Sequence, residues 1–186
     1  MSVIEDGKGT SKKARVSDTN RLDVSAKSNG RIYYVSRDDK KVFSVNLQIS
    51  QASGGTTENL GYIKNNGTNH LHINSITFST AEPSTGLTKF GIWVNQTVNE
   101  SGTEKIPTNL NLTSSLTSVA ICYEGPGLTF SEGESIGTIR LSGAGSFDKN
   151  YDDALILGRS NILTIKVNAA TTGTQTVATI VFWEHD

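Results

Sequence analysis

Short apolar runs separated by polar turns recur along most of this chain, and they constrain its fold more than any other feature. Turn signals recur at short intervals along the chain, and Gly54-Gly55, Gly125-Pro126 and Thr172-Gly173 are among them. No stretch repeats apolar residues at the 3.6-residue period of a helix. Roughly ten short strands joined by turns are typical of an antiparallel β-sandwich. We therefore predict an all-β, antiparallel, jelly-roll-like sandwich over residues 31–186, with an extended arm over residues 1–30.

The cleanest strand pattern lies just after the charged turn at residues 37–41. Phe43, Val45, Leu47 and Ile49 alternate with polar residues, which predicts a strand buried on one face. Further strands are expected at residues 32–35, 90–94, 110–112, 118–123, 136–141, 155–157 and 163–167.

Residues 60–78 read as a β-hairpin, because Asn66-Gly67 separates two β-prone runs and both residues tolerate a positive φ. Within the second run Leu71 and Ile73 have one parity, but Ile76 and Phe78 have the other. A β-bulge near Asn74-Ser75 would return all four side chains to one buried face.

The last expected strand, residues 177–183, is apolar on both parities. It is either a central strand covered on both faces or a strand whose outer face meets another subunit. The second alternative makes a candidate subunit interface of Val177, Thr179, Val181 and Trp183.

Charged residues are distributed unevenly along the chain, although the net charge is only −1. Residues 1–41 hold ten Lys and Arg against six Asp and Glu, and residues 42–186 hold seven against twelve. Residues 1–30 have too few apolar residues to fold alone, so they form either a disordered tail or an arm that orders on a partner. The candidate partner-binding residues of the arm are Lys8, Lys12, Lys13, Arg15, Val16, Arg21 and Leu22. Interspersed acids and the lack of aromatic residues argue against nucleic acid and favour an acidic protein surface.

No motif identifies a reaction or a cofactor, so we expect a protein that is not an enzyme. The segment Gly133-Glu134-Ser135-Ile136-Gly137 matches Gly-x-Ser-x-Gly, but a nucleophile elbow needs a preceding strand and a following helix. His70 and His72 could chelate a metal only with ligands from symmetry-related chains, and no metal site is assigned.

Two further residue types receive structural explanations. The Asp pairs at residues 38–39 and 152–153 are expected in turns, although a glycosidase could use such carboxylates. Cys122 lies in an apolar strand and is expected to be a small buried side chain.

Residues 1–6 lack the features of a signal peptide and no apolar run is long enough to span a bilayer, so we expect synthesis in a cytoplasm and no membrane contact.

Several stretches resemble small virion structural proteins of tailed bacteriophages. They are Ile4-Glu5-Asp6-Gly7-Lys8-Gly9, the run Leu60-Gly61-Tyr62-Ile63-Lys64-Asn65, and the ending Leu157-Gly158-Arg159 that closes on Val181-Phe182-Trp183-Glu184. The resemblance implies a capsid decoration (cement) or head-fibre subunit, made in the host bacterial cytoplasm and located in the virion. It also implies a major capsid protein or another virion protein as partner, and a homo-oligomer, most simply a trimer.

Two alternatives to that role remain open. One is a phage tail or collar component. The other is a carbohydrate- or receptor-binding sandwich, in which Tyr33, Trp93, Tyr123 or Tyr151 would form a sugar platform.

Overall fold

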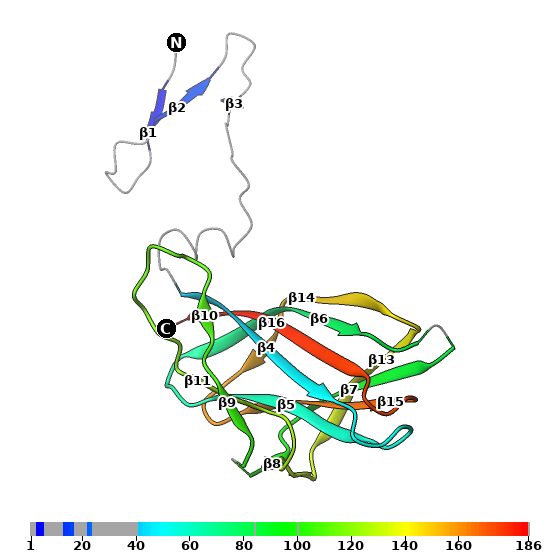
Figure 1. The fold of residues 1–186 in the computed structure, drawn as a ribbon. Coiled ribbons are helices and arrows are strands. Elements are labelled where there is room, and N and C mark those ends of the chain that lie inside the picture. Colours follow the sequence, from blue (N-terminus) through cyan, green and yellow to red (C-terminus); the bar gives the residue numbers. More distant parts are fainter. Residues whose placement is uncertain are drawn as a thin grey trace. The chain divides into compact units, whose positions relative to one another are not determined.

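The computed structural model describes residues 41–83, 85–99 and 101–185, together with the backbone of three short strands nearer the N-terminus. The chain divides into two compact units, Met1–Gly30 and Arg31–Asp186. Eight long strands build the second unit (Figure 1): β4 (Val42–Ser50), β5 (Glu58–Asn65), β6 (His70–Thr80), β7 (Leu87–Val94), β13 (Glu134–Ser142), β14 (Gly145–Leu157), β15 (Ile162–Ala169) and β16 (Gln175–His185).

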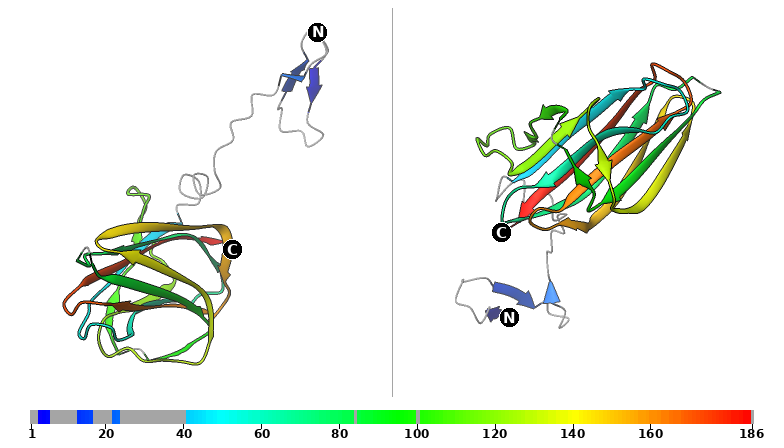
Figure 2. Two further views of the ribbon diagram at one scale, coloured as in Figure 1. Left: turned by 90° about the vertical axis from the view of Figure 1, so that its right-hand side faces the viewer. Right: turned by 90° about the horizontal axis from the view of Figure 1, so that it is seen from below.

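These eight strands pair in a nested order. The first pairs with the last (β4–β16), the second with the seventh (β5–β15), the third with the sixth (β6–β14) and the fourth with the fifth (β7–β13), all antiparallel. The two central contacts, β16–β6 and β15–β7, complete the sheets β4-β16-β6-β14 and β5-β15-β7-β13. This is the strand order of a jelly roll, and the two sheets stack as layers in Figure 2. The predicted all-β, antiparallel sandwich is therefore confirmed.

A long insertion between β7 and β13 extends both sheets on one side. It contains β8 (Thr97–Val98), β9 (Thr103–Lys105), β10 (Thr108–Asn109), β11 (Ala120–Glu124) and β12 (Phe130–Ser131). Strands β11 and β9 add to the sheet beside β5, and β10 adds to the other sheet beside β4. The outermost strands on this side are only two and three residues long, which leaves little edge for unwanted pairing with another chain.

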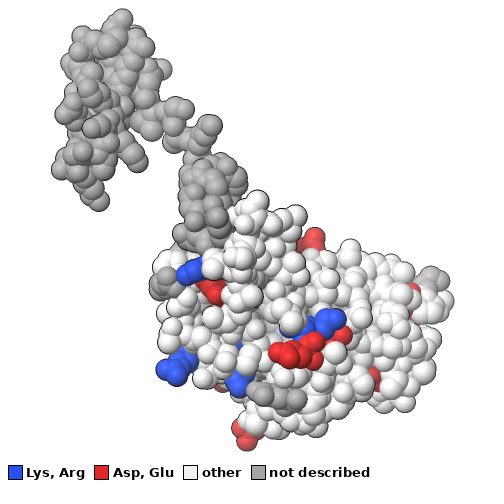
Figure 3. Space-filling model, turned by 60° about the vertical axis from the view of Figure 1, so that its left-hand side comes forward, with Lys and Arg blue, Asp and Glu red and all other residues white. Residues whose placement is uncertain are grey.

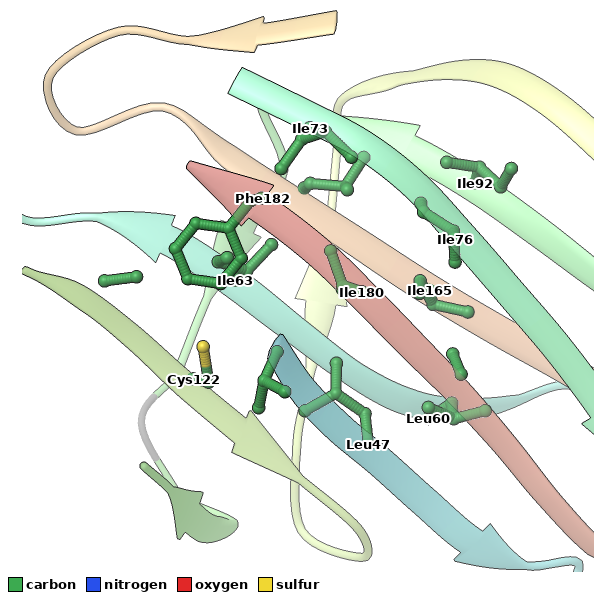
Figure 4. Packing of buried hydrophobic residues seen from close by; sticks show 14 of the residues in the cluster. Leu47, Leu60, Ile63, Ile73, Ile76, Ile92, Cys122, Ile165, Ile180 and Phe182 are labelled. Atoms are coloured by element: carbon green, nitrogen blue, oxygen red, sulfur yellow. The ribbon is translucent and has the colours of Figure 1, made fainter. Parts of the chain in front are cut away.

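One continuous hydrophobic core fills the space between the sheets. Figure 4 shows Leu47, Ile76, Ile180 and Phe182 of one sheet facing Leu60, Ile63, Ile92 and Ile165 of the other. The alternation predicted from Phe43 to Ile49 is confirmed, because these four side chains are buried and the polar residues between them are exposed or half-buried. Burying each such aliphatic side chain contributes about 1.5–3 kcal/mol, so the sandwich needs no disulfide.

The hairpin predicted at residues 60–78 is wrong, because β5 and β6 lie in different sheets. The turn between them is a corner that carries the chain from one layer to the other. The side chain of Asn65 holds this corner: its amide donates to the carbonyls of Asn69 (2.6 Å) and Leu157 (2.9 Å), and its Oδ1 accepts from Gly67 N (3.0 Å). A glycine is needed at position 67 because a Cβ there would lie 2.6 Å from Val119.

The bulge predicted in β6 is confirmed. Ile73 is opposite Phe182 and Ser75 is opposite Val181, so Asn74 is the extra residue. As expected, Leu71, Ile73, Ile76 and Phe78 are then all buried.

Other strand predictions were only partly right. Residues 110–112 are not a strand, since β10 ends at Asn109 and a turn follows. Asp152 and Asp153 do not lie in a turn between strands but in a bulge within β14, with φ of 47° and 65°. The strand expected at residues 32–35 and the Asp pair at residues 38–39 lie outside the described residues.

Residues 1–30 contain three short antiparallel strands, β1 (Val3–Glu5), β2 (Lys13–Val16) and β3 (Leu22–Asp23). Their pairing was not predicted, because two- to four-residue strands leave no clear periodicity. The role of this segment as an arm stays a prediction.

Candidate interaction surfaces

The outer face of β16 carries most of the residues of the candidate subunit interface, which was suggested because this strand is apolar on both parities. In the structure β16 is a central strand, and Val177, Thr179 and Val181 are half-buried on its outer face. Their cross-strand neighbours are all polar: Ser44, Asn46, Gln48, Ser75, Thr77 and Ser79. The apolar side chains here form a narrow stripe within a polar face, so a contact with another subunit at this place stays a prediction.

Trp183, the fourth residue of that suggested interface, is fully buried and has no exposed surface to offer a partner. It stacks on His72 with ring centroids 4.0 Å apart, and its indole Nε1 donates to Asp153 Oδ1 at 2.6 Å. The bulge in β14 brings Asp153 to this position, across the intervening β6. The second carboxylate of the Asp152-Asp153 pair therefore has a structural role.

The three histidines of the chain gather near Trp183. His185 is opposite His70 in the β16–β6 pairing, and the His72 ring lies 6.5 Å from that of His70 and 6.1 Å from that of His185. Within the described segments, no group of three or more His, Cys, Asp or Glu side chains is arranged to hold a metal ion. The cluster is a group of aromatic rings at one end of the sheet, in which His72 and Trp183 are stacked and the other ring pairs are edge-to-face.

The Gly-x-Ser-x-Gly motif has no nucleophile elbow around it. Ser135 is an exposed residue of the edge strand β13 and is opposite Trp93 of β7. The segment before it is a turn in which Glu132 and Gly133 have φ of 60° and 82°. His185, the residue that would act as base, lies at the end of β16 in the other sheet.

Cys122 is a buried residue of β11, as predicted, and it contacts the core. Burial raises the pKa of its thiol far above the ordinary value, and the nearby charge of Glu104 raises it further. A thiol that stays protonated is a poor nucleophile and a poor metal ligand.

The sugar-platform residues do not lie together. Trp93 and Tyr123 belong to the six-stranded sheet, and Tyr151 belongs to the other sheet and packs against the core. Tyr123 is stacked on Tyr62 (5.6 Å), and burial raises the pKa of Tyr151. Tyr33 lies outside the described residues, and the three described candidates, Trp93, Tyr123 and Tyr151, form no aromatic platform.

The sequence did not reveal the surface formed by residues 106–119, which we call the apolar loop. This segment has no charged residue, and it holds five of the nine exposed large hydrophobic side chains in the described residues: Ile106, Leu110, Leu112, Leu116 and Val119. Leu112 is 89% exposed and Ile106 is 81% exposed. Clustered exposed aliphatic residues mark an interaction surface more clearly than single ones do.

Hydrogen bonds within the apolar loop and to the sandwich fix its conformation. Leu110 N donates to Val42 O (2.8 Å), and Asn109 Nδ2 donates to Leu116 O (3.2 Å). At its base Glu184 of β16 accepts from Ser118 Oγ (2.6 Å) and Val119 N (2.9 Å). These hydrogen bonds favour the observed conformation of the loop, and such preorganisation lowers the entropy lost on binding.

A surface hollow of about 390 Å³ lies beside the apolar loop. Ile106, Pro107, Val119 and Ile121 form much of its wall, and Gly67 of the β5–β6 corner also lines it. Lys105 on its rim is paired with Glu124 at 3.2 Å. Figure 3 views the side of the sandwich that carries β9 to β11, and charged side chains there form only small scattered groups on an uncharged surface.

Four of the seven candidate partner-binding residues of the arm lie in its short strands. Lys13, Arg15 and Val16 belong to β2, and Leu22 belongs to β3. Lys8, Lys12 and Arg21 lie outside the described residues, as do the side chains of the other four. The described segments contain no helix that is long and apolar enough to cross a bilayer.

One buried carboxylate joins two loops at an end of the sandwich. Glu82 accepts hydrogen bonds from the hydroxyls of Thr174 (3.0 Å) and Thr88 (3.4 Å). Burial acts to raise the pKa of Glu82, but hydrogen bonds from Thr171, Thr174 and Thr88 favour the ionised form, and the pKa lies below its ordinary value.

Comparison with known proteins gives little to add to this geometry. No protein-family model matches the chain, and no curated protein does. Among solved structures, the chain is similar to that of the infectious bursal disease virus Gt strain, with 13% identity over 77% of this chain and 41% of that chain and a TM-score of 0.20.

Two related structures give the same result. They are infectious bursal virus derived T=1 particles (16% identity, 77% of this chain, 39% of that chain, TM-score 0.20) and the infectious bursal disease virus VP2 subviral particle (15%, 78%, 42%, TM-score 0.20). The chain spans about two-fifths of the length of these proteins. TM-scores this low support no functional conclusion.

Proposed function

We propose that this protein is a non-enzymatic structural subunit of a virus particle, of the decoration (cement) or head-fibre kind in a tailed phage. Its partner is a major capsid protein or another virion protein, and residues 1–30 anchor it there. Copies of the chain associate with one another, most simply as a trimer. The protein is located in the virion.

The observation that carries this proposal is the apolar loop on a rigid jelly roll. An exposed, charge-free and hydrogen-bonded loop suits permanent contact with protein, and its exposed aliphatic residues have no evident role in a chain that stays alone. Jelly rolls are common in viral capsid domains, which is support by analogy of fold only.

The apolar loop fits a second copy of the same chain. Leu112 projects from it, and the hollow walled by Ile106 and Val119 lies beside it, so each copy offers both a projecting side chain and a receptor for one. A standard interface uses roughly 20–30 residues a side, more than this 14-residue loop has, so the contact must extend over the hollow and its rim.

Charge supports a separate role for residues 1–30. Residues 1–30 hold six Lys and Arg against four Asp and Glu, and this positive excess complements an acidic shell, while residues 42–186 are net negative and would be repelled by one. An extended segment also anchors a subunit without a large preformed surface.

Charge reversal in the full-length chain tests the anchoring. Tagged Lys12→Glu/Lys13→Glu protein is supplied during infection by the virus that encodes the chain, and its amount in purified particles is measured by mass spectrometry. We expect strong loss of incorporation. The control, Lys149→Glu/Arg159→Glu, makes the same change in net charge at exposed positions of the body and should incorporate normally. Equal incorporation of both variants, or absence of the unaltered chain from particles, would refute the proposal.

A further inference from the structure

A second surface hollow, of about 270 Å³, lies on the outer face of the six-stranded sheet. Most of its lining comes from three adjacent strands: Lys89, Gly91 and Trp93 of β7, Ser135 and Thr138 of β13, and Lys166 of β15. Thr57, just before β5, also lines it. Cross-strand pairing fixes this arrangement, because Gly91 lies between Thr138 on one side and Lys166 on the other.

Glycine at position 91 creates the depth of this hollow. A Cβ added to Gly91 would lie 3.0 Å from Trp93 Nε1 and 4.0 Å from the Cβ of Lys166. The indole N–H edge of Trp93 therefore borders the space that a side chain at position 91 would fill. The floor is a backbone that leaves room for a ligand, beside a hydrogen-bond donor.

The charged residues that line the hollow are both lysines. They are Lys89 and Lys166, and Arg140 of β13, which does not line the hollow itself, is directly opposite Lys89. No Asp or Glu lines it, and within residues 41–83, 85–99 and 101–185 none of these three cations is in an ion pair. Lys166 Nζ lies 4.7 Å from the centre of the Trp93 ring, which positions this ammonium group over the indole.

We propose that this hollow is a binding site for an anionic group, the carboxylate or sulfate of an acidic sugar or the free anion. Three like charges on one face of an otherwise acidic body repel one another, and a bound anion relieves that repulsion. Arg140 offers a planar fork that matches a carboxylate or sulfate, and Lys89 supplies a second charge. The indole N–H of Trp93 and the hydroxyls of Ser135 and Thr138 complete a set of donors.

This site also gives Ser135 a role that its motif did not predict. Its hydroxyl lines a hollow bordered by cations, where a donor to a bound anion is useful and a nucleophile has no base. The inference does not rest on the proposed virion function, because it concerns the isolated chain.

Titration of the purified full-length chain tests the site by tryptophan fluorescence. The probes are sodium sulfate, glucuronate and glucose at constant ionic strength. Because Trp183 is fully buried, a change on binding reports on Trp93. We expect saturable changes with sulfate and glucuronate and none with glucose. Equal affinity for the two anions identifies a free-anion site, and at least tenfold tighter binding of glucuronate identifies an acidic-sugar site.

Two variants separate a built site from general attraction of anions. Lys89→Gln/Arg140→Gln removes exposed charge and should weaken binding at least tenfold. Gly91→Ala leaves the charge unchanged but fills the floor, and should weaken binding similarly. The control Lys149→Gln alters an exposed lysine of the other sheet and should bind as the unaltered chain does. Circular dichroism checks that each variant is folded. Absence of saturation, equal response to glucose, or unchanged binding by both hollow variants would overturn the proposal.

Discussion

The β5–β6 corner yields a prediction that separates it sharply from a hairpin. In a hairpin, Asn66 and Gly67 would be the critical turn residues and Asn65 would be an ordinary strand residue. In the corner, the fully buried Asn65 side chain makes three hydrogen bonds and the Asn66 side chain is exposed. We therefore compare Asn65→Ala with Asn66→Ala.

The expected cost of Asn65→Ala follows from those three hydrogen bonds. Each contributes about 0.5–1.5 kcal/mol net, and a buried acceptor left without its donor costs about 1–3 kcal/mol. The carbonyl of Leu157, a residue that is 2% exposed, would be such an acceptor. We expect a loss of about 3–4 kcal/mol of unfolding free energy, which corresponds to a fall in Tm of roughly 6–16 °C for a domain of this size. Asn66→Ala should stay within about 0.5 kcal/mol of the unaltered protein.

Equilibrium unfolding in urea, followed by tryptophan fluorescence, measures both variants. An unchanged m-value shows that the difference lies in stability and not in the extent of unfolding. If the two variants have equal stability, or if Asn66→Ala is the more harmful, the assignment of the corner to Asn65 is refuted.

Three further predictions concern a buried acid, a buried thiol and the apolar loop. Because the folded-state pKa of Glu82 is lowered, its contribution to stability is full above the ordinary glutamate pKa of about 4.3 and is lost as the pH falls through the folded-state pKa; Glu82→Gln should flatten the pH dependence of urea unfolding below about pH 5. Cys122 should react with a thiol reagent at pH 8 only when the chain is unfolded, and rapid reaction of the native protein would contradict its burial. Leu112→Asp should convert the oligomer to a monomer in light scattering, whereas Ile156→Asp, a change at an exposed aliphatic residue of β14, should not; a monomeric unaltered chain would exclude self-association through the loop.

The sequence predicted the sandwich because a strand that is buried on one face has an apolar residue at every second position. The alternation from Phe43 to Ile49 follows directly from a strand with one face on the core. The bulge at Asn74 was predictable for the same reason, since a change of parity between Ile73 and Ile76 has to be absorbed by an extra residue.

Features that depend on contacts between residues far apart in the sequence produce no such local pattern. An Asn-Gly turn is compatible with a hairpin and with a corner, and what distinguishes them is the contact of Asn65 with Leu157, 92 residues away. Leu110 and Leu112 have the parity of a strand, and only the folded chain shows that they are exposed. The anion hollow was invisible for a similar reason, because Gly91, Arg140 and Lys166 come together only through strand pairing.

The nested pairing of the strands also determines when the sheet can be completed during synthesis. Strand β16 occupies the place between β4 and β6, yet it is made after every other strand of the sandwich. Until Gln175–His185 has left the ribosome, β4 and β6 each have an unpaired row of backbone groups along that gap. During this time the nascent chain has two exposed strand edges that can pair with other chains. A ribosome stalled before Gln175 would therefore hold a chain that is prone to aggregate.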